Sequence, residues 1–594
     1  MNKSPLKIVL TIVGIAGLAA GLAVCANIAR ATLWDEYAAA PDTHPNIPNC
    51  SFAGYHYGET PLPENTATDA PATRFAPRIN VKNFAAKGDG NTDDTEAIRA
   101  ALASVKPDTG GVIFFPNGRY KISGVLFVHT NKTVLRGETR DGVELIFTNP
   151  LDRAYHEWRI PPPDFRKQDR TNSHWSYMGG LIWFTPLKRG TTYFPPDTPT
   201  EGIFPAVSRR AFDGPALPLS PAKRGDNTVK IAAKNTDSNA FAAGDFVRLQ
   251  QRDPGDYSLL KHLCGGGSWA DAFDWQNASY GGAWKTPDPQ TWIVEIAAVA
   301  HDKTTGETTL TLRQPLRFDV QTRWQPTVQK LIPLIRESGI ENMTLRFLRD
   351  YTWTPKDHHK ESGWNAPFFN YAVHCWLRDV TMLDMENGPG LADAKCITMT
   401  RFKLGATSPA RLAHHHGTIC RMSYDNLWSD FLIESQPAHG LNVEAFASGN
   451  VWMRGVLEHG VLDTHRRIPH DNLHTDITLV RNDGWHGGDG GPALGARSVE
   501  WNIRVENDKN SDRTDEQTSY MVGWANVHPW GAIVGLQGAE LTWHGGPKRA
   551  TASKYSPVGE GVSKCRIESE NTIPTPANLY EAQLQLRLQS LREN

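Results

Sequence analysis

Short apolar runs that open with asparagine or serine recur along the carboxy-terminal half of the chain. They begin at Asn426, Asn450, Asn472 and Ser498, at intervals of 24, 22 and 26 residues. Each run is too short for a helix and ends in polar residues and glycine, which is typical of a short strand. A fixed interval of 20–30 residues with one such strand predicts a solenoid, in which each coil buries its apolar face against the next.

A second repeat has the same period. Between residues 414 and 489 the dipeptide His-Gly occurs at His416, His439, His459 and His486, at intervals of 23, 20 and 27 residues. If each coil places the pair at the same corner, the four imidazoles form a column along one face. The glycine could instead serve the corner alone, so a structural and a chemical role both stay open. Two separate periods of about one coil support the solenoid prediction.

Further toward the amino terminus, glycines and acids frame a helix and several short strands. The pattern is Gly88-Asp89-Gly90, Asp93-Asp94-Thr95, a helix from Glu96 to Ser104, Gly110-Gly111-Val112, and Phe115-Pro116-x-Gly118-x-Tyr120. It resembles the amino-terminal signature of the pectate-lyase-like superfamily, over about sixty residues. The resemblance implies a single-stranded right-handed parallel β-helix and structural roles for the three aspartates. It implies no single reaction, because the same scaffold carries lyases, hydrolases, epimerases and phage adhesins.

The expected fold is therefore all-β, a right-handed parallel β-helix with an inserted small β module and short terminal helices. Between the solenoid segments, the runs 228–233, 245–249, 292–296 and 308–312 predict the strands of that module. The predicted division is 1–31 signal peptide or anchor, 32–77 tether, 78–150 start of the β-helix, 151–335 inserted module, 336–545 main coils, and 546–594 tail with a closing helix.

The chain opens with an export signature. Lys3 and Lys7 precede an apolar run over residues 8–26, which small residues follow. The run is long for a cleaved signal peptide and just sufficient to span a bilayer, so an uncleaved membrane tether is an alternative, as is lipidation at Cys25. Each reading places the body outside the cytoplasm, in the periplasm, on the cell surface or secreted.

The amino-acid composition indicates which classes of partner and substrate to expect. The chain is 39% hydrophobic with 51 glycines and 40 prolines, as in turn-rich β proteins, and its formal charge of −2 gives no reason to expect a nucleic-acid partner. Its 19 tryptophans and 15 tyrosines could stack on sugar rings. A long flat wall of strands suits a polymer, so we expect a polysaccharide substrate. Assembly into a homotrimer is an alternative to a monomer.

Titratable residues are densest between His414 and Asp489. For uronate lyases of the superfamily, the resemblance implies a base that removes the C5 proton and a positive charge that stabilises the carboxylate. His465 could be the base, Asp463 could orient it, and Arg466 or Arg467 could bind the carboxylate. His416 or His470 could protonate the leaving group, and His439 is a further catalytic candidate. Expected substrate-binding residues are Arg467, Glu444, His459, Trp485, His486 and Asp489.

Three other interpretations stay open. In a structural one, Asp463 pairs with Arg466 and Asn472 begins an asparagine ladder. A glycoside hydrolase would need two carboxyl groups, for which Glu444, Asp463 and Asp489 are candidates. A non-catalytic adhesin would need neither.

No resident metal is expected. The cysteines lack a C-x-x-C spacing, and in an alternating strand only His414 and His416 of the His414-His415-His416 run would converge. Calcium at Asp483 and Asp489 is the alternative. The prediction is thus a carbohydrate-active enzyme, most simply a polysaccharide lyase acting by β-elimination.

Overall fold

The computed structural model describes most of the chain. The described residues are 31–63, 77–154, 173–186, 214–234, 240–272, 275, 289–358, 360–465, 467–482, 485–486, 495–506, 519–523, 528–544 and 564–593. The predicted signal peptide or anchor over residues 1–31 lies outside them, apart from its last residue. Within these ranges, no helix is both long and apolar enough to cross a membrane.

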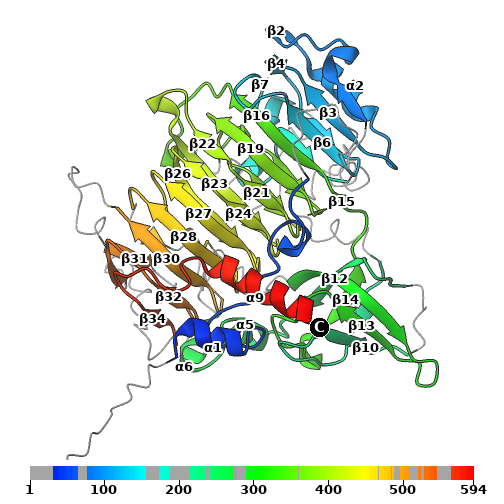
Figure 1. Ribbon diagram of the computed structural model, residues 1–594, viewed down its shortest axis with the longest axis vertical. Coiled ribbons are helices and arrows are strands. Elements are labelled where there is room, and N and C mark those ends of the chain that lie inside the picture. The colour runs from blue at the N-terminus through cyan, green and yellow to red at the C-terminus, as the bar shows by residue number, and fades with distance from the viewer. Residues whose placement is uncertain are drawn as a thin grey trace, which may run out of the picture.

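A long sheet runs the length of the molecule, and every strand pair in it is parallel (Figure 1). Seventeen strands make it up within the described residues. They are β1 (Arg78–Asn80), β2 (Asp89–Asp93), β3 (Gly111–Phe115), β4 (Gly118–Ile122), β6 (Thr133–Gly137), β7 (Val143–Phe147), β16 (Gly339–Phe347), β19 (Trp376–Leu383), β21 (Thr398–Thr400), β22 (Lys403–Gly405), β24 (Leu427–Ser429), β25 (Leu432–Ile433), β27 (Val451–Leu457), β28 (Leu473–Leu479), β30 (Val499–Val505), β32 (Ala532–Val534) and β34 (Arg566–Glu568). This confirms the parallel β-helix.

The spacing of the apolar runs sets the register of this sheet. Leu427 pairs with Val451, Val451 with Leu473, and Leu473 with Val499. One residue further on, the rings of Trp428 and Trp452 stack with centroids 4.5 Å apart. Each interval of 22–26 residues is therefore one coil, as the sequence predicts.

The asparagines that open these runs form a buried ladder. Asn450 accepts a 2.8 Å hydrogen bond from the side chain of Asn426 and donates one of 2.9 Å to Asn472. The ladder satisfies polar groups that a coil corner would otherwise leave buried and unpaired. An asparagine ladder is thus present, but Asn472 stands at its end and not at its beginning as the structural interpretation expected, because Asn426 and Asn450 precede it.

A second parallel sheet forms another wall of the coils, and smaller sheets complete it. The second sheet contains β5 (Leu126–Val128), β8 (Ile182–Phe184), β17 (Phe368–Asn370), β20 (Gly390–Ala392), β23 (Ala413–Arg421) and β26 (Gln436–Glu444). The smaller ones are β15 (Ile335–Arg336) with β18 (Ala372–Val373), and β29 (Trp485–His486) with β31 (Ser519–Gly523) and β33 (Glu540–His544).

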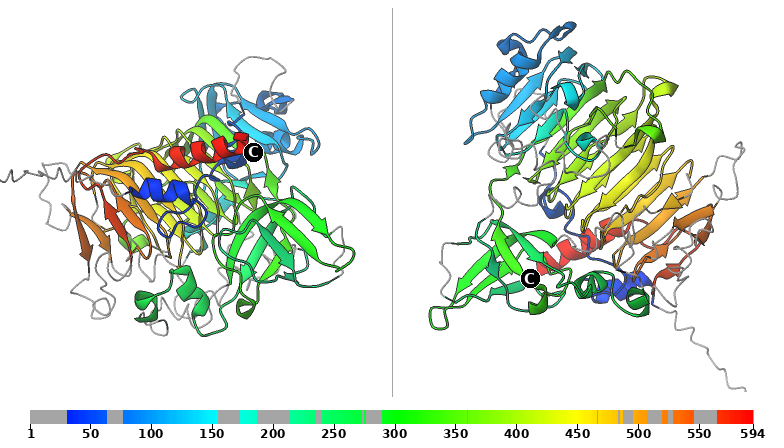
Figure 2. Two further views of the ribbon diagram at one scale, coloured as in Figure 1. Left: turned by 60° about the horizontal axis from the view of Figure 1, so that its bottom comes forward. Right: turned by 180° about the vertical axis from the view of Figure 1, so that it is seen from behind.

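The inserted module is an antiparallel sheet beside the coils (Figure 2). Its strands are β9 (Leu217–Pro218), β10 (Thr228–Ile231), β11 (Phe246–Gln251), β12 (Gln290–His301), β13 (Thr308–Leu312) and β14 (Thr327–Lys330), with helices α5 (Ser258–Leu263) and α6 (Ser268–Ala272). The four predicted strands are confirmed. Its expected start at residue 151 is wrong, because β8 still pairs with β5 and β17 of the second sheet.

Buried charges fasten the module to one corner of the coils. Asp425 is fully buried and is bound by Lys395 from the neighbouring coil and by Arg317 from the module. Asp471, two coils further, is bound by Arg497 and lies 2.6 Å from Nδ1 of His470. These contacts join the module to the coils at one corner. We call this group the docking corner; it consists of Asp425, Lys395, Arg317, Asp471, His470 and Arg497.

The segment expected to be a tether packs on the long sheet instead. Helix α1 (Leu33–Ala39) begins at a capping box made by Thr32 and Asp35, and it buries Leu33 and Tyr37. The closing helix α9 (Leu579–Glu593) lies on the same face and contacts β28. The apolar side chains that both helices share with the sheet explain why this segment is ordered.

The remaining helices are short. They are α2 (Thr95–Ala103), α3 (Leu151–Ala154) and the 3-10 turns η1 (Tyr55–Gly58), η2 (Val81–Phe84), η4 (His174–Ser176), η5 (Thr322–Trp324), η6 (Pro355–Asp357) and η7 (Pro409–Arg411). Helix α2 lies where the signature places it. Asp93 accepts the backbone N–H of Thr95 and Asp94 that of Gly88, which agrees with structural roles for these acids.

Candidate functional site

Glycines in successive coils bring the second sheet's backbones unusually close together. A methyl group on Gly417 would lie 2.6 Å from the carbonyl oxygen of Gly440, and one on Gly440 would lie 2.1 Å from that of Val461. Only glycine fits such an approach. The residue before each glycine is thereby held in line with its neighbour, and His416 pairs directly with His439.

Two of the four His-Gly pairs form the predicted column, and two do not. Val461, not Gly460, occupies the place of the glycine beside Gly440, so the pair at His459 is one residue out of line. His486 lies on β29, whose partner is β31 of a separate sheet. The expectation of four stacked imidazoles is therefore wrong for His459 and His486, because equal spacing in sequence does not guarantee equal register.

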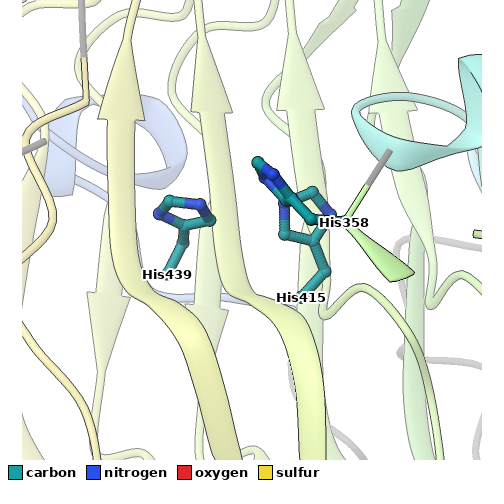
Figure 3. Close-up of side chains that lie close together, drawn as sticks. All are labelled: His358, His415 and His439. Carbon is teal, nitrogen blue, oxygen red and sulfur yellow. The ribbon is translucent and has the colours of Figure 1, made fainter. Parts of the chain in front are cut away.

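Other histidines join His416 and His439 to give a cluster of five imidazoles in the described residues, which we call the histidine cluster. Figure 3 shows three of its members, with His415 and His439 on neighbouring strands. The centroids of His415 and His416 lie 3.8 Å apart, and those of His416 and His439 lie 4.9 Å apart. His358 and His465 complete the cluster, 4.4 Å from His415 and 4.6 Å from His439.

Asp463 joins two of these rings. Its Oδ2 lies 3.1 Å from Nδ1 of His439 and 3.6 Å from Nδ1 of His465, and it accepts a 2.8 Å hydrogen bond from Asn442. Burial alone would raise the pKa of this carboxyl, but the two histidines and their hydrogen bonds hold it well below its usual range. Asp463 is therefore an ionised carboxylate that orients two imidazoles.

Glu361 supports the opposite side of the cluster. Its Oε1 lies 2.8 Å from Nδ1 of His415 and accepts a 3.2 Å hydrogen bond from the indole of Trp353, while Ser176 binds its other oxygen. Burial raises the pKa of Glu361. Burial and the neighbouring imidazoles lower the pKa of His358 to about 3, which favours the neutral form of that ring.

His416 does not suit the expected role of proton donor. Its side chain is buried, and its Nδ1 lies 2.8 Å from the amide oxygen of Asn387. Burial, with the adjacent imidazoles, lowers its pKa well below the ordinary value. The imidazolium that would donate a proton is therefore absent near neutral pH.

His470 lies in the docking corner and not in the histidine cluster. It is fully buried and bound to Asp471, and burial lowers its pKa. Although Asp463 and His470 are close in sequence, the turn between them places them on different walls of the coil. The expectation that His470 takes part in the same site is wrong.

The other expected site residues fall into three groups. Glu444 is buried and forms a 2.8 Å ion pair with Arg421, so its carboxylate is already engaged. Arg467 is partly exposed two residues after His465. Arg466, Asp483 and Asp489 lie outside the described residues, and for Trp485 and His486 only the backbone is described.

Sequence reasoning missed His358, His415, Glu361 and Tyr177. His415 was expected to face away from His416 because strand residues alternate, but the centroids of the two rings lie 3.8 Å apart. His414, the expected partner of His416, instead lies 2.9 Å from Ser435. The other three come from loops, whose position no periodicity predicts.

Tyr177 covers part of the site. Its ring centroid lies 6.0 Å from that of His415 and 6.2 Å from that of His416, and the guanidinium of Arg421 lies 5.9 Å away. Among the cluster, His439 keeps a 20% exposed side chain and His465 one of 10%. The arrangement thus places a phenol against oriented imidazoles, of which His439 is partly exposed.

Comparison with known proteins agrees with the fold. Residues 78–155 match the family model for rhamnogalacturonase A/epimerase, pectate lyase-like. Alginate lyase 7 of Azotobacter vinelandii is 53% identical over 45 residues, which are 8% of this chain and 5% of that protein. Mannuronan C5-epimerase AlgE3 of the same organism is 49% identical over 46 residues, 8% of this chain and 2% of the epimerase. The matched segment therefore spans a twentieth or less of these relatives.

Two solved structures resemble the chain at low identity. The tailspike protein gp49 from Pseudomonas phage LKA1 has a TM-score of 0.42 and 11% identity, over 78% of this chain and 64% of the tailspike. The A-module of mannuronan C-5 epimerase AlgE6 from Azotobacter vinelandii has a TM-score of 0.34 and 10% identity, over 83% of this chain and 99% of the module. Function has to be argued from the site.

Proposed function

We propose that this chain, which carries a pectate-lyase-like parallel β-helix, is an extracytoplasmic enzyme that cleaves an acidic polysaccharide by β-elimination. The observation that carries this proposal is the ionised Asp463 holding the imidazoles of His439 and His465 at the surface of the second sheet. An imidazole oriented by a carboxylate can act as the base that such an elimination needs. The location rests on the apolar run over residues 8–26.

The residues divide into roles as follows. His465 removes the C5 proton of a uronate, and Asp463 is its positioning residue. The electrons form the C4–C5 double bond as the C4–O bond breaks, and Tyr177 gives its phenolic proton to the leaving oxygen. Arg467 stabilises the carboxylate, whose negative charge would otherwise resist proton loss at C5.

The hydrolase alternative fits Glu444 and Asp463, the two described carboxylates that the sequence offers for it, less well. A glycoside hydrolase needs one carboxyl group that stays protonated beside one that is ionised. Glu444 is paired with Arg421, and the pKa of Asp463 is held well below its usual range. An adhesin would have no need of a buried carboxylate that orients imidazoles. Assembly into a homotrimer stays a prediction.

The test uses the full chain and a panel of polysaccharides. Mannuronate, guluronate, galacturonate and glucuronate polymers are compared with neutral glucans, and the ultraviolet absorbance of unsaturated ends is followed alongside reducing ends. We expect both signals to rise with at least one acidic polymer. His465→Ala abolishes both, while the matched control His301→Ala, a partly buried histidine of the inserted module, leaves them unchanged. Reducing ends alone, or no product with any polymer, would contradict the proposal.

A further inference from the structure

We propose that His358, His415 and His439 bind a divalent transition-metal ion of the zinc type. One ring nitrogen from each histidine lies within 4.8 Å of those of the other two (Figure 3). Zn–N bonds of about 2.0–2.1 Å place the nitrogens of a tetrahedral site roughly 3.3 Å apart. A small side-chain rotation would therefore bring the three ring nitrogens to the spacing of a metal site.

Carboxylates hold two of the three rings in the manner of metal ligands. Glu361 lies 2.8 Å from Nδ1 of His415, and Asp463 lies 3.1 Å from Nδ1 of His439. Histidine ligands commonly donate one ring N–H to a carboxylate, which fixes the tautomer and leaves the other nitrogen to bind the ion. Both rings would then bind through Nε2.

The supporting backbone combines two fixed ligands with an adjustable one. His415 and His439 lie on the paired strands β23 and β26, whose spacing the glycine contacts fix. His358 follows η6, a short turn that begins at a capping box made by Thr354 and Asp357. Because His358 lies in a loop, its side chain can rotate to bring a ring nitrogen within bonding distance of the ion without disturbing the sheet.

The ligand type selects the ion. Three imidazoles suit zinc and its neighbours among the transition metals, whereas calcium and magnesium prefer oxygen ligands. Three protein ligands also leave a fourth position for water or a substrate oxygen. In the proposed elimination that position would take the uronate carboxylate; this second role rests on the proposed function, but binding of the ion does not.

A neighbouring group, His439 with Asp463 and His465, is also compact, with its ligand atoms within 4.8 Å. We assign the ion to the first group because Oδ2 of Asp463 already accepts a hydrogen bond from Asn442 and faces Nδ1 of His439. These contacts place Asp463 behind the ligands, where it orients them.

The experiment measures the metal directly. The purified full chain is stripped with a chelator, titrated with Co²⁺ as a visible-absorbing probe, and back-titrated with Zn²⁺. We expect one ion per chain and tetrahedral cobalt bands. His358→Ala and His439→Ala should each weaken binding at least 100-fold, Asp463→Asn should weaken it 10–100-fold, and His301→Ala should not change it. Circular dichroism checks that each variant is folded.

Three results would overturn the site: no stoichiometric ion, binding unchanged in a folded His358→Ala variant, or binding that requires His465 but not His358. The assay also separates the two proposals. If metal-free protein still forms unsaturated ends, the proposed lyase activity stands and the ion has only a structural role. If the protein binds one ion but is inactive on every polymer, the proposed metal site stands and the proposed function is overturned.

Discussion

The histidine cluster and the docking corner contain the same kinds of residue in opposite arrangements. In the docking corner, each buried carboxylate meets a buried cation: Asp425 is bound by Lys395 and Arg317, and Asp471 by Arg497. In the histidine cluster, imidazole rings contact one another, and Asp463 and Glu361 are the carboxylates of the described residues that contact them. The first arrangement neutralises its charges, whereas the second leaves lone pairs and protons for chemistry.

The difference teaches that density of titratable residues does not identify a site. Asp463-x-His465 and His470-Asp471 are neighbours in sequence, and each pairs an acid with an imidazole. The first lies beside the partly exposed ring of His439, and only the second has an arginine on its acid. Substitutions that treat the two regions alike should therefore give different results.

The largest effect is expected from matched Asp→Asn changes in the two regions. Asp425→Asn leaves Lys395 and Arg317 buried without a counter-charge, so the free energy of unfolding should fall by about 3–5 kcal/mol. Asp463→Asn should cost far less stability but lower kcat/KM on the identified polymer about 10²–10⁴-fold, because it removes the group that orients the base. Urea unfolding and steady-state kinetics measure the two effects. Equal stability losses with equal activity would erase the distinction between the regions.

The next effect concerns the glycines that align the histidine cluster. In Gly440→Ala the new methyl group would meet the carbonyl oxygen of Val461 at 2.1 Å, so the coils must separate. We expect the free energy of unfolding to fall by about 1–3 kcal/mol, as in an overpacked core. Gly405→Ala in β22 is the control, since its nearest neighbour is a flexible leucine side chain at 3.3 Å. A Gly440→Ala variant as stable as the control would show that the coils are not in close contact there.

The solenoid could be predicted from sequence because its register is repeated. The apolar runs that begin at Asn426, Asn450 and Asn472 stack in the order and spacing that the sequence gives them. The histidine cluster could be predicted only in part. His439, Asp463 and His465 lie in the coils, whereas His358, Glu361 and Tyr177 reach the cluster from connecting loops, and tertiary packing alone decides where those side chains lie.

The module and the amino-terminal segment show the same limit. Alternating residues predict the strands β10 to β13, but nothing local indicates that β8 belongs to the coils. Residues 32–62 are rich in proline and small residues, and they are ordered only because Leu33, Tyr37 and Cys50 are buried against the long sheet and α9. Burial against a distant surface is invisible to composition.

A smaller effect tests how the fold tolerates a buried imidazole that lies outside both regions. His474 is buried against Trp452 with centroids 4.8 Å apart, and Glu500 and His528 face it. Burial lowers its pKa to about 4. The unfolded chain therefore binds more protons below its ordinary pKa of about 6.5, and stability is lost as the pH falls through that window.

His474→Phe keeps an aromatic ring in the stack and removes the titration. We expect the variant to gain up to about 2 kcal/mol relative to the native chain at pH 5 and little of that linkage term at pH 8. Urea unfolding at both pH values measures the difference. An identical pH dependence in both proteins would mean that His474 keeps its charge inside the fold, as the cations of the docking corner do.

The smallest effect is expected where the sequence predicts a site and the register excludes it. His459 has the same His-Gly context as His416 and His439, but Val461 stands where the aligned glycine would be. His459→Ala should therefore change kcat/KM and metal affinity less than about twofold and stability by less than about 0.5 kcal/mol. His439→Ala, one coil earlier, provides the matched loss of metal. If His459→Ala impaired either property as strongly, the column of histidines would extend by another coil, and the site would include His459.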